Sequence, residues 1–133
     1  MKLLDTTFLI HYWAGRENAK TYLKQHEESE FSTTALNIKE LAVGRDLQGK
    51  LDRHEILTTF AWLRIIPFRT EHAFVAGPLE AELHRDGNVN QDKINALAGD
   101  VLIAAVAKER GATVVTENAD DFELFDGISV ESY

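Results

Sequence analysis

Short segments with the residue pattern of strands alternate along the chain with longer stretches in which apolar residues recur every three or four positions. The short segments predict strands at residues 2–4, 30–32, 64–67, 113–115 and 128–130. The longer stretches predict helices, through their apolar spacing, their capping residues or both, at residues 6–14, 17–28, 34–50, 52–62, 70–85 and 100–110.

Strands separated by helices indicate an α/β protein in three layers, with a mostly parallel central sheet of four to five strands flanked by helices. Ligands of such sheets bind outside the carboxyl ends of the strands. Gly77 and Pro78 interrupt the helix predicted at 70–85, and we expect a kink or a break there. The sequence has no repeat, low-complexity tract or flexible linker, so we expect a single domain over residues 1–133.

Composition narrows the possible functions. The absence of cysteine excludes disulfide scaffolds and zinc–thiolate sites and suits a reducing cytoplasm. A net charge of −8, from 14 basic and 22 acidic residues, argues against broad electrostatic binding to nucleic acid but leaves local contact through bound cations open. The first residues lack the apolar core of a signal peptide, and the longest helical apolar run, at 101–107, is too short to span a bilayer. We therefore expect a cytoplasmic protein without a membrane segment.

Two aspartates stand where an apolar element meets a helix. Asp5 follows the first strand, and Asp100 opens the apolar segment 101–107. Each is suited to cap its helix, and each is equally suited to act chemically at the end of a buried element. Thr6 and Thr7 can also cap the first helix, which leaves the Asp5 carboxylate free for another task.

Glu40 calls for an argument from helical periodicity. At about 100° per residue it falls within the apolar stripe formed by Leu36, Val43 and Leu47. A carboxylate among such side chains needs a partner or a cation, because burial of a bare charge is unfavourable. The spacing therefore favours a ligand role over a solvated surface position.

The fourth acidic region, at residues 114–122, runs from a strand into a polar loop. Such loops often carry chemistry, although Asn and Asp are also ordinary turn formers. Two carboxylates about 4 Å apart repel by roughly 4 kcal/mol at an effective dielectric near 20, so a cluster of them needs a positive partner. Magnesium, with its preference for oxygen ligands, meets that need. The five histidines have no spacing typical of a zinc site, and we expect none of them to be a metal ligand.

Four segments, in this order and at these separations, resemble the motifs of PIN-domain nucleases and specifically of VapC-type toxins of toxin–antitoxin pairs. Residues 4–10 (LDTTFLI) are similar to the family's opening Asp-Thr-Ser/Thr motif, and residues 37–41 (NIKEL) to its helical glutamate. Residues 99–105 (GDVLIAA) are similar to its third acidic motif. Residues 115–122 (VTENADDF) are similar to its closing Thr-x-Asn-x-x-Asp-Phe segment. The resemblance extends over essentially the whole chain.

The resemblance implies a PIN fold, usually dimeric, with Mg²⁺ or Mn²⁺ bound by Asp5, Glu40, Asp100 and Asp121. Thr116 and Asn118 would support this site through hydrogen bonds. The implied activity is cleavage of RNA phosphodiester bonds by metal-activated water, leaving a 5′-phosphate, in a toxin that a small antitoxin protein inhibits. At the fourth ligand position Asn118, Asp120 and Asp121 compete, because some family members place that ligand at the residue matching Asn118.

Other functions remain as alternatives. A receiver-like phosphoacceptor domain shares the parallel sheet and clustered acids, but it needs adjacent acids after the first strand, where this chain has Leu4, Asp5 and Thr6. A catalytically silent PIN-like binding module is a second alternative, although the presence of all four acids argues against it. A purely structural partner subunit is the third.

Overall fold

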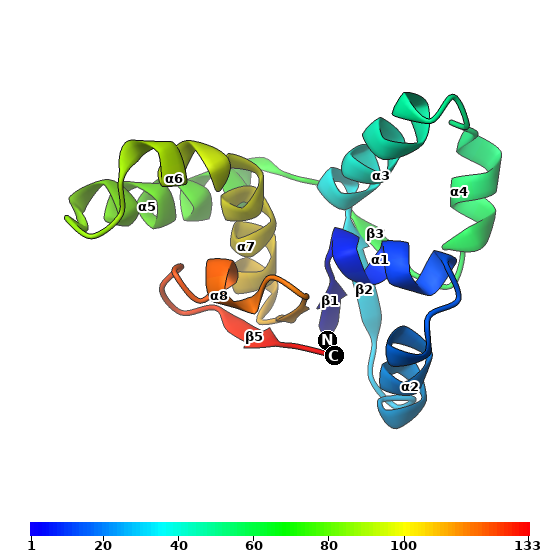
Figure 1. Ribbon diagram of the computed structural model, residues 1–133. Helices are drawn as coiled ribbons and strands as arrows, with labels where there is room; N and C mark the ends of the chain where they lie inside the picture. The colour runs from blue at the N-terminus through cyan, green and yellow to red at the C-terminus, as the bar shows by residue number, and fades with distance from the viewer.

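The computed structural model describes residues 1–133 and has five strands and eight helices (Figure 1). The strands are β1 (Lys2–Leu4), β2 (Phe31–Thr34), β3 (Arg64–Ile66), β4 (Thr113–Val115) and β5 (Ser129–Glu131). The helices are α1 (Thr6–Trp13), α2 (Glu17–Gln25), α3 (Ala35–Leu47), α4 (Arg53–Thr59), α5 (Thr70–Arg85), α6 (Gln91–Ala96), α7 (Ala98–Arg110) and α8 (Ala119–Phe122).

All five strands form one parallel sheet in the order β3-β2-β1-β4-β5. Strand β1 lies at the centre, with Leu3 paired to Ser32 of β2 on one side and to Val114 of β4 on the other. The prediction of a mostly parallel sheet of four to five strands is confirmed. Because the strands are parallel, their carboxyl ends lie along one edge, which is where the acidic segments begin.

Successive side chains of the central strands point to opposite faces of the sheet. The hydrophobic core therefore has two parts, one on each face. Leu3 and Val114 pack into a cluster formed largely by α5, α6 and α7. Leu4 and Val115 point the other way and pack against side chains from α1, α2 and α4. All four of these strand side chains are fully buried, and each such burial stabilises the fold by about 1.5–3 kcal/mol.

Helix α5 differs from the prediction, because it runs without a break from Thr70 to Arg85 with Pro78 inside it. The expected interruption at Gly77 and Pro78 is therefore wrong as a break in the helix. Proline removes one hydrogen bond to the carbonyl four residues earlier, that of Phe74, whose side chain is among the most exposed apolar groups of the protein. At such a solvent-facing position water can satisfy the freed carbonyl.

Other differences lie at element ends. Two short helices, α6 and α8, were not predicted, and α7 begins at Ala98 rather than Asp100 because α6 leads into it through Leu97. Helix α3 ends at Leu47, before the predicted residue 50, and α2 ends at Gln25 rather than at residue 28. None of the helices is long and apolar enough to cross a membrane.

Candidate metal centre

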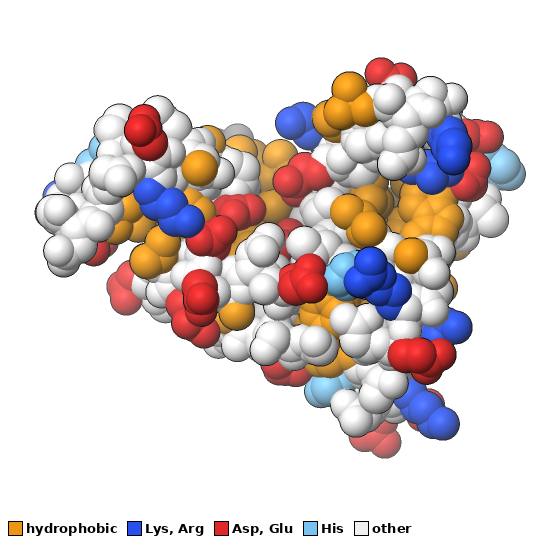
Figure 2. Space-filling view, in the orientation of Figure 1, with side chains coloured by type: hydrophobic (Ala, Val, Ile, Leu, Met, Phe, Trp, Pro, Cys, Tyr) orange, Lys and Arg blue, Asp and Glu red, His pale blue; other side chains and the backbone are white.

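The sheet places two of the sequence-predicted segments side by side. Asp5 follows β1 and Thr116 follows the neighbouring β4, and the Asp5 backbone N–H donates to the carbonyl oxygen of Val115 at 3.0 Å. Glu40 lies in α3, which follows β2 on the other side of β1. Asp100 and Asp121 come from the first turns of α7 and α8. Figure 2 shows acidic side chains gathered around the hollow between the two lobes of the molecule.

Asp5 is held rigidly at the bottom of this region. Only 4% of it is exposed, and its carboxylate accepts hydrogen bonds from Asn37 Nδ2 at 3.0 Å and from Thr116 Oγ1 at 2.8 Å. Asp5 occupies the N-cap position of α1, yet its side chain makes no capping hydrogen bond. Burial raises the pKa of Asp5, and hydrogen bonds from Thr116, the Thr6 backbone and Asn37 oppose that rise.

Asn37 is a site residue that sequence reasoning missed. It is completely buried in the first turn of α3, where it forms a capping box with Thr34. Its amide nitrogen also donates to Asp5 Oδ1 and to Thr6 Oγ1, both at 3.0 Å, while Thr6 Oγ1 donates to Glu40 Oε1 at 2.8 Å. One buried amide therefore connects two of the four acids. Its signal in the sequence was its place three residues after Thr34 and three before Glu40.

Glu40 reaches the cluster in a different way from the one its sequence position suggested. The apolar stripe that it shares is not a buried face, since Val43 is 47% exposed and Leu47 is 84% exposed. Glu40 is itself exposed, but its carboxylate is turned toward Thr6. Partial loss of water there raises the pKa of Glu40; the Thr6 hydrogen bond lowers it, and the charge of Asp5 raises it further.

Asp100 is where the repulsion within the cluster concentrates. Burial, followed by the charges of Asp5, Glu40 and Asp121, raises the pKa of Asp100 from 3.8 to about 7, and Lys93 opposes this rise. The N-terminal end of α7 favours negative charge, but it does not offset three nearby carboxylates. All four sequence-predicted acids therefore interact electrostatically at one place, although they come from four separate elements.

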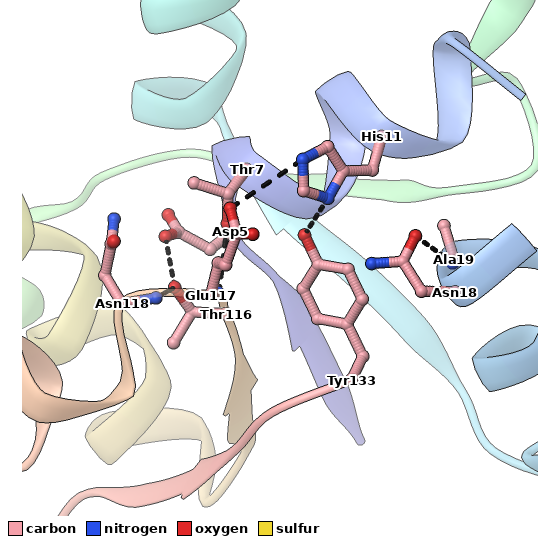
Figure 3. Close-up of polar contacts among 9 residues, drawn as sticks. All are labelled: Asp5, Thr7, His11, Asn18, Ala19, Thr116, Glu117, Asn118 and Tyr133. Atoms are coloured by element: carbon pink, nitrogen blue, oxygen red, sulfur yellow. Dashed lines mark hydrogen bonds and ion pairs between the residues drawn. The ribbon is translucent and has the colours of Figure 1, made fainter. Parts of the chain in front are cut away.

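The closing segment is also ordered around Asp5, as Figure 3 shows. Thr116 Oγ1 donates to Asp5 and accepts from the Asn118 backbone N–H at 3.0 Å. The Glu117 backbone N–H donates to Thr7 Oγ1 at 3.2 Å, which ties this loop to α1. Thr116 thus contacts an acid directly, whereas Asn118 supports the arrangement through its backbone.

Asp121 has a partner that the sequence did not reveal. Lys93 Nζ on α6 lies 2.6 Å from Asp121 Oδ1, and both side chains are partly open to solvent. Asp120, by contrast, is exposed and has no ion pair. Of the three candidates for the fourth position, Asp121 is the one whose charge contributes to the raised pKa of Asp100.

Comparison with known proteins bears on this arrangement. The PIN domain family matches residues 2–128, nearly the whole chain. The chain belongs to the PIN-domain family. None of the curated proteins matches it. Among solved structures, DNA-bound VapBC from Salmonella typhimurium is 25% identical in sequence, with a TM-score of 0.80. The match covers 98% of this chain and 96% of the Salmonella chain.

Two further solved structures resemble this PIN domain. FitAcB from Neisseria gonorrhoeae is 25% identical, with a TM-score of 0.75 over 98% of this chain and 96% of its own. VapBC2 from Rickettsia felis, bound to a promoter DNA fragment, is 20% identical, with a TM-score of 0.79 over 99% of this chain and 98% of its own. The resemblance to VapC-type PIN proteins noted in the sequence is confirmed, while the roles of its individual acids stay a prediction.

The donor set of this PIN domain fits a hard divalent cation. The four acids all offer carboxylate oxygens, and burial together with three neighbouring negative charges raises the pKa of Asp100. No three of the four acids bring one oxygen each within 4.8 Å of one another. The four carboxylates therefore do not form a closed coordination shell by themselves.

A second group of possible ligands in this PIN domain, Glu71, His72 and Glu109, has its ligand atoms within 4.8 Å of one another. The Arg69 backbone N–H donates to His72 Nδ1 at 2.8 Å, so the ring proton is on Nε2, which lies 3.1 Å from Glu109 Oε2. A protonated nitrogen is not a metal ligand. His72, which is completely buried, therefore joins the start of α5 to the end of α7.

Proposed function

We propose that this PIN domain is a metal-dependent endoribonuclease toxin that cleaves RNA phosphodiester bonds and is inhibited by a cognate antitoxin. The observation that carries the proposal is the convergence of acids from separate elements: Asn37 and Thr6 link Asp5 to Glu40 through hydrogen bonds, and the charges of Asp5, Glu40 and Asp121 act on Asp100. A cluster this short of positive charge is suited to bind a cation. Membership of the PIN-domain family and likeness to toxin–antitoxin structures support the same conclusion.

In this proposal, Asp5, Glu40, Asp100 and Asp121 hold Mg²⁺ or Mn²⁺. When bound, the cation supplies a water of lowered pKa and neutralises charge that develops on the phosphate oxygens. Asn37 and Thr116 fix the orientation of Asp5 by occupying one lone pair on each of its oxygens. The Thr6 hydroxyl fixes Glu40 in the same manner. These hydrogen bonds hold the two carboxylates in place before the substrate arrives, which avoids reorganisation during the reaction.

The antitoxin fits a hollow beside Glu40. This hollow of about 400 Å³ lies between α1 and α3, and it is lined by Ile10, Trp13, Ala14, Glu40, Leu41, Gly44, Arg45 and Gln48. Ile10 is half exposed there, so an apolar side chain of a partner gains contact area. A partner seated in this hollow would cover Glu40, one of the four acids. We also propose a homodimer, for which sedimentation of the purified protein is the direct measurement.

The test of the activity uses Asp5→Asn and a matched control, Asp46→Asn, which changes an exposed acid on the same side of the sheet. RNA is incubated with each purified protein in Mg²⁺, in Mn²⁺ and in EDTA. We expect wild type and Asp46→Asn to cleave RNA only with a divalent cation and Asp5→Asn to lose at least about 100-fold in rate. Equal cleavage by Asp5→Asn and wild type contradicts the catalytic assignment. Absence of cleavage by every protein favours a silent binding module.

A further inference from the structure

The acidic cleft contains one ammonium group that neither the family motifs nor the proposed chemistry uses. Lys93 Nζ lies 2.6 Å from Asp121 Oδ1, and its positive charge opposes the raised pKa of Asp100. The Lys93 side chain is 42% exposed, so its ammonium is open to solvent while it touches the cluster. A group in this place meets whatever enters the cleft.

Retention of the fold does not require this ion pair. Helix α6 is anchored by the buried side chains of Ile94 and Leu97, and Asn90 caps its first turn through a 2.8 Å hydrogen bond from the Lys93 backbone N–H. An ion pair between partly exposed groups contributes about 0–1 kcal/mol. The Lys93 side chain is therefore free to exchange partners without loss of the helix that carries it.

We infer that Lys93 is a substrate-positioning residue: it holds Asp121 in the cation-free protein and turns to a phosphate oxygen of the RNA once a divalent cation has taken its place at Asp121. This inference rests on the proposed function. The ammonium and the cation compete for the same carboxylate, because both are positive and one oxygen of Asp121 is already in contact with Lys93. Once displaced, a lysine on a flexible four-carbon stem lies beside a cation-bound phosphate and matches its charge.

The negative net charge of the protein opposes the binding of RNA, so a basic side chain at the site favours binding. The protein carries −8 overall, and the four acids face the position where a polyanion would bind. Of the basic residues, Lys93 is the one that forms an ion pair with a member of the cluster. The charge of Lys39 also acts on Glu40, but Lys93 is the lysine in direct contact with one of the four acids, and it supplies attraction for RNA at that point.

The inference gives opposite expectations for two measurements on Lys93→Gln. Binding of Mn²⁺, followed by the rise in melting temperature on titration, should tighten by about threefold to tenfold because a competing charge is gone. RNA cleavage should fall by about 10- to 100-fold in kcat/KM because a charge-assisted hydrogen bond to phosphate is lost. A purely structural lysine would weaken both or neither. Lys93→Arg keeps the charge, and it should stay within about twofold of wild type in Mn²⁺ binding.

A binding measurement removes the dependence on catalysis. Asp5 is kept because it is a proposed cation ligand, and the substrate is instead a short single-stranded RNA with phosphorothioate linkages, which resist hydrolysis and keep the phosphate charge. Affinity of the wild-type protein for this RNA is measured against salt concentration with Mg²⁺ present. Adding Lys93→Gln should lower the slope of log affinity against log salt by about 0.7, the value for one lost contact to single-stranded phosphate. In EDTA the two proteins should have equal slopes, since Lys93 then holds Asp121. Lys24→Gln, an exposed lysine of α2, is the control for net charge.

The outcomes separate the two proposals. A wild-type protein that cleaves no RNA with either cation overturns the proposed function. A wild type that cleaves, together with a Lys93→Gln variant that binds Mn²⁺ no more tightly or keeps the full salt slope in Mg²⁺, overturns the inference about Lys93 alone.

Discussion

Replacement of Asp100 by Asn should make the protein more stable, even though it removes a proposed metal ligand. The pKa of Asp100 is raised from 3.8 to about 7, which means that the folded protein holds a proton that the unfolded chain has released across that range. The free energy of unfolding therefore falls as the pH rises from about 4 to about 7, because Asp100 must ionise in the folded protein. At pH 8 Asp100 is ionised, and its charge destabilises the folded protein by the full amount. Asparagine has no such charge and removes the penalty.

The size of the effect follows from the same shift. The interval from 3.8 to about 7 corresponds to about 4 kcal/mol at 1.36 kcal/mol per pH unit. Asp100 is only half-buried, so water and salt screen its neighbours, and we expect about 1–2 kcal/mol. For a chain of this length that amounts to a melting temperature about 3–8 °C higher at pH 8 in EDTA. At pH 4 wild type and variant should melt together.

The assay is thermal unfolding of both proteins from pH 4 to pH 8, with and without Mg²⁺. The cation should stabilise wild type by mass action and stabilise Asp100→Asn less. Glu28→Gln, at an exposed turn, is the control for loss of one acid and should show neither effect. If Asp100→Asn is less stable than wild type at pH 8, or if their difference does not change with pH, the assignment of Asp100 to a crowded carboxylate cluster is refuted.

Three other expectations concern stability. Asn37→Leu should lower the free energy of unfolding by about 2–3 kcal/mol in urea titrations, because Asp5 loses a buried hydrogen bond and α3 loses its capping box; unchanged stability would show that water replaces the amide. The hydrogen bond from Lys2 lowers the pKa of Glu131 below 4.5, so Glu131→Gln should cost about 1 kcal/mol at pH 7, and this cost should shrink as the pH falls below 4.5. A constant difference would exclude the ion pair as its cause. Pro78→Ala should raise the melting temperature in thermal unfolding by restoring a helical hydrogen bond; an unchanged or lower melting temperature would contradict this expectation.

The sheet could be predicted from the sequence for two reasons. Each strand is marked by a short local pattern, and strands separated by helices can be arranged in only a few ways. Short segments such as 2–4 (KLL) and 113–115 (TVV) each carry two adjacent apolar residues between polar breaks, and helices between successive strands favour parallel crossovers. Helices α6 and α8 were missed because four to six residues contain too little periodicity to stand out from a loop. The uninterrupted α5 shows that packing against α7 outweighs the intrinsic penalty of Pro78.

The candidate site was predicted unevenly for physical reasons. Asp5 and Asp100 stand at the junctions of apolar and polar sequence, where position alone restricts their role. Glu40 was chosen from an apolar stripe that proved exposed, so the residue was placed near Asp5 by α3 and Thr6 and not by burial. Lys93 lies in a polar stretch without any pattern, and only the packing of α6 brings it to Asp121. Contacts between side chains that are far apart in sequence need the tertiary fold.

The four acids differ in what holds them, and that difference has a functional consequence. Asp5 is fixed by two protein hydrogen-bond donors that water does not reach, and neither donor is positively charged. Asp121 is held by a lysine that solvent does reach. Neutral donors do not neutralise the charge of ionised Asp5, which can then attract a cation, whereas the charge of Asp121 is neutralised until a cation displaces Lys93. Cation binding should therefore begin at the Asp5 side of the cluster and recruit Asp121 last, which makes Asp121 the most tolerant of the four positions to substitution in Mn²⁺ binding.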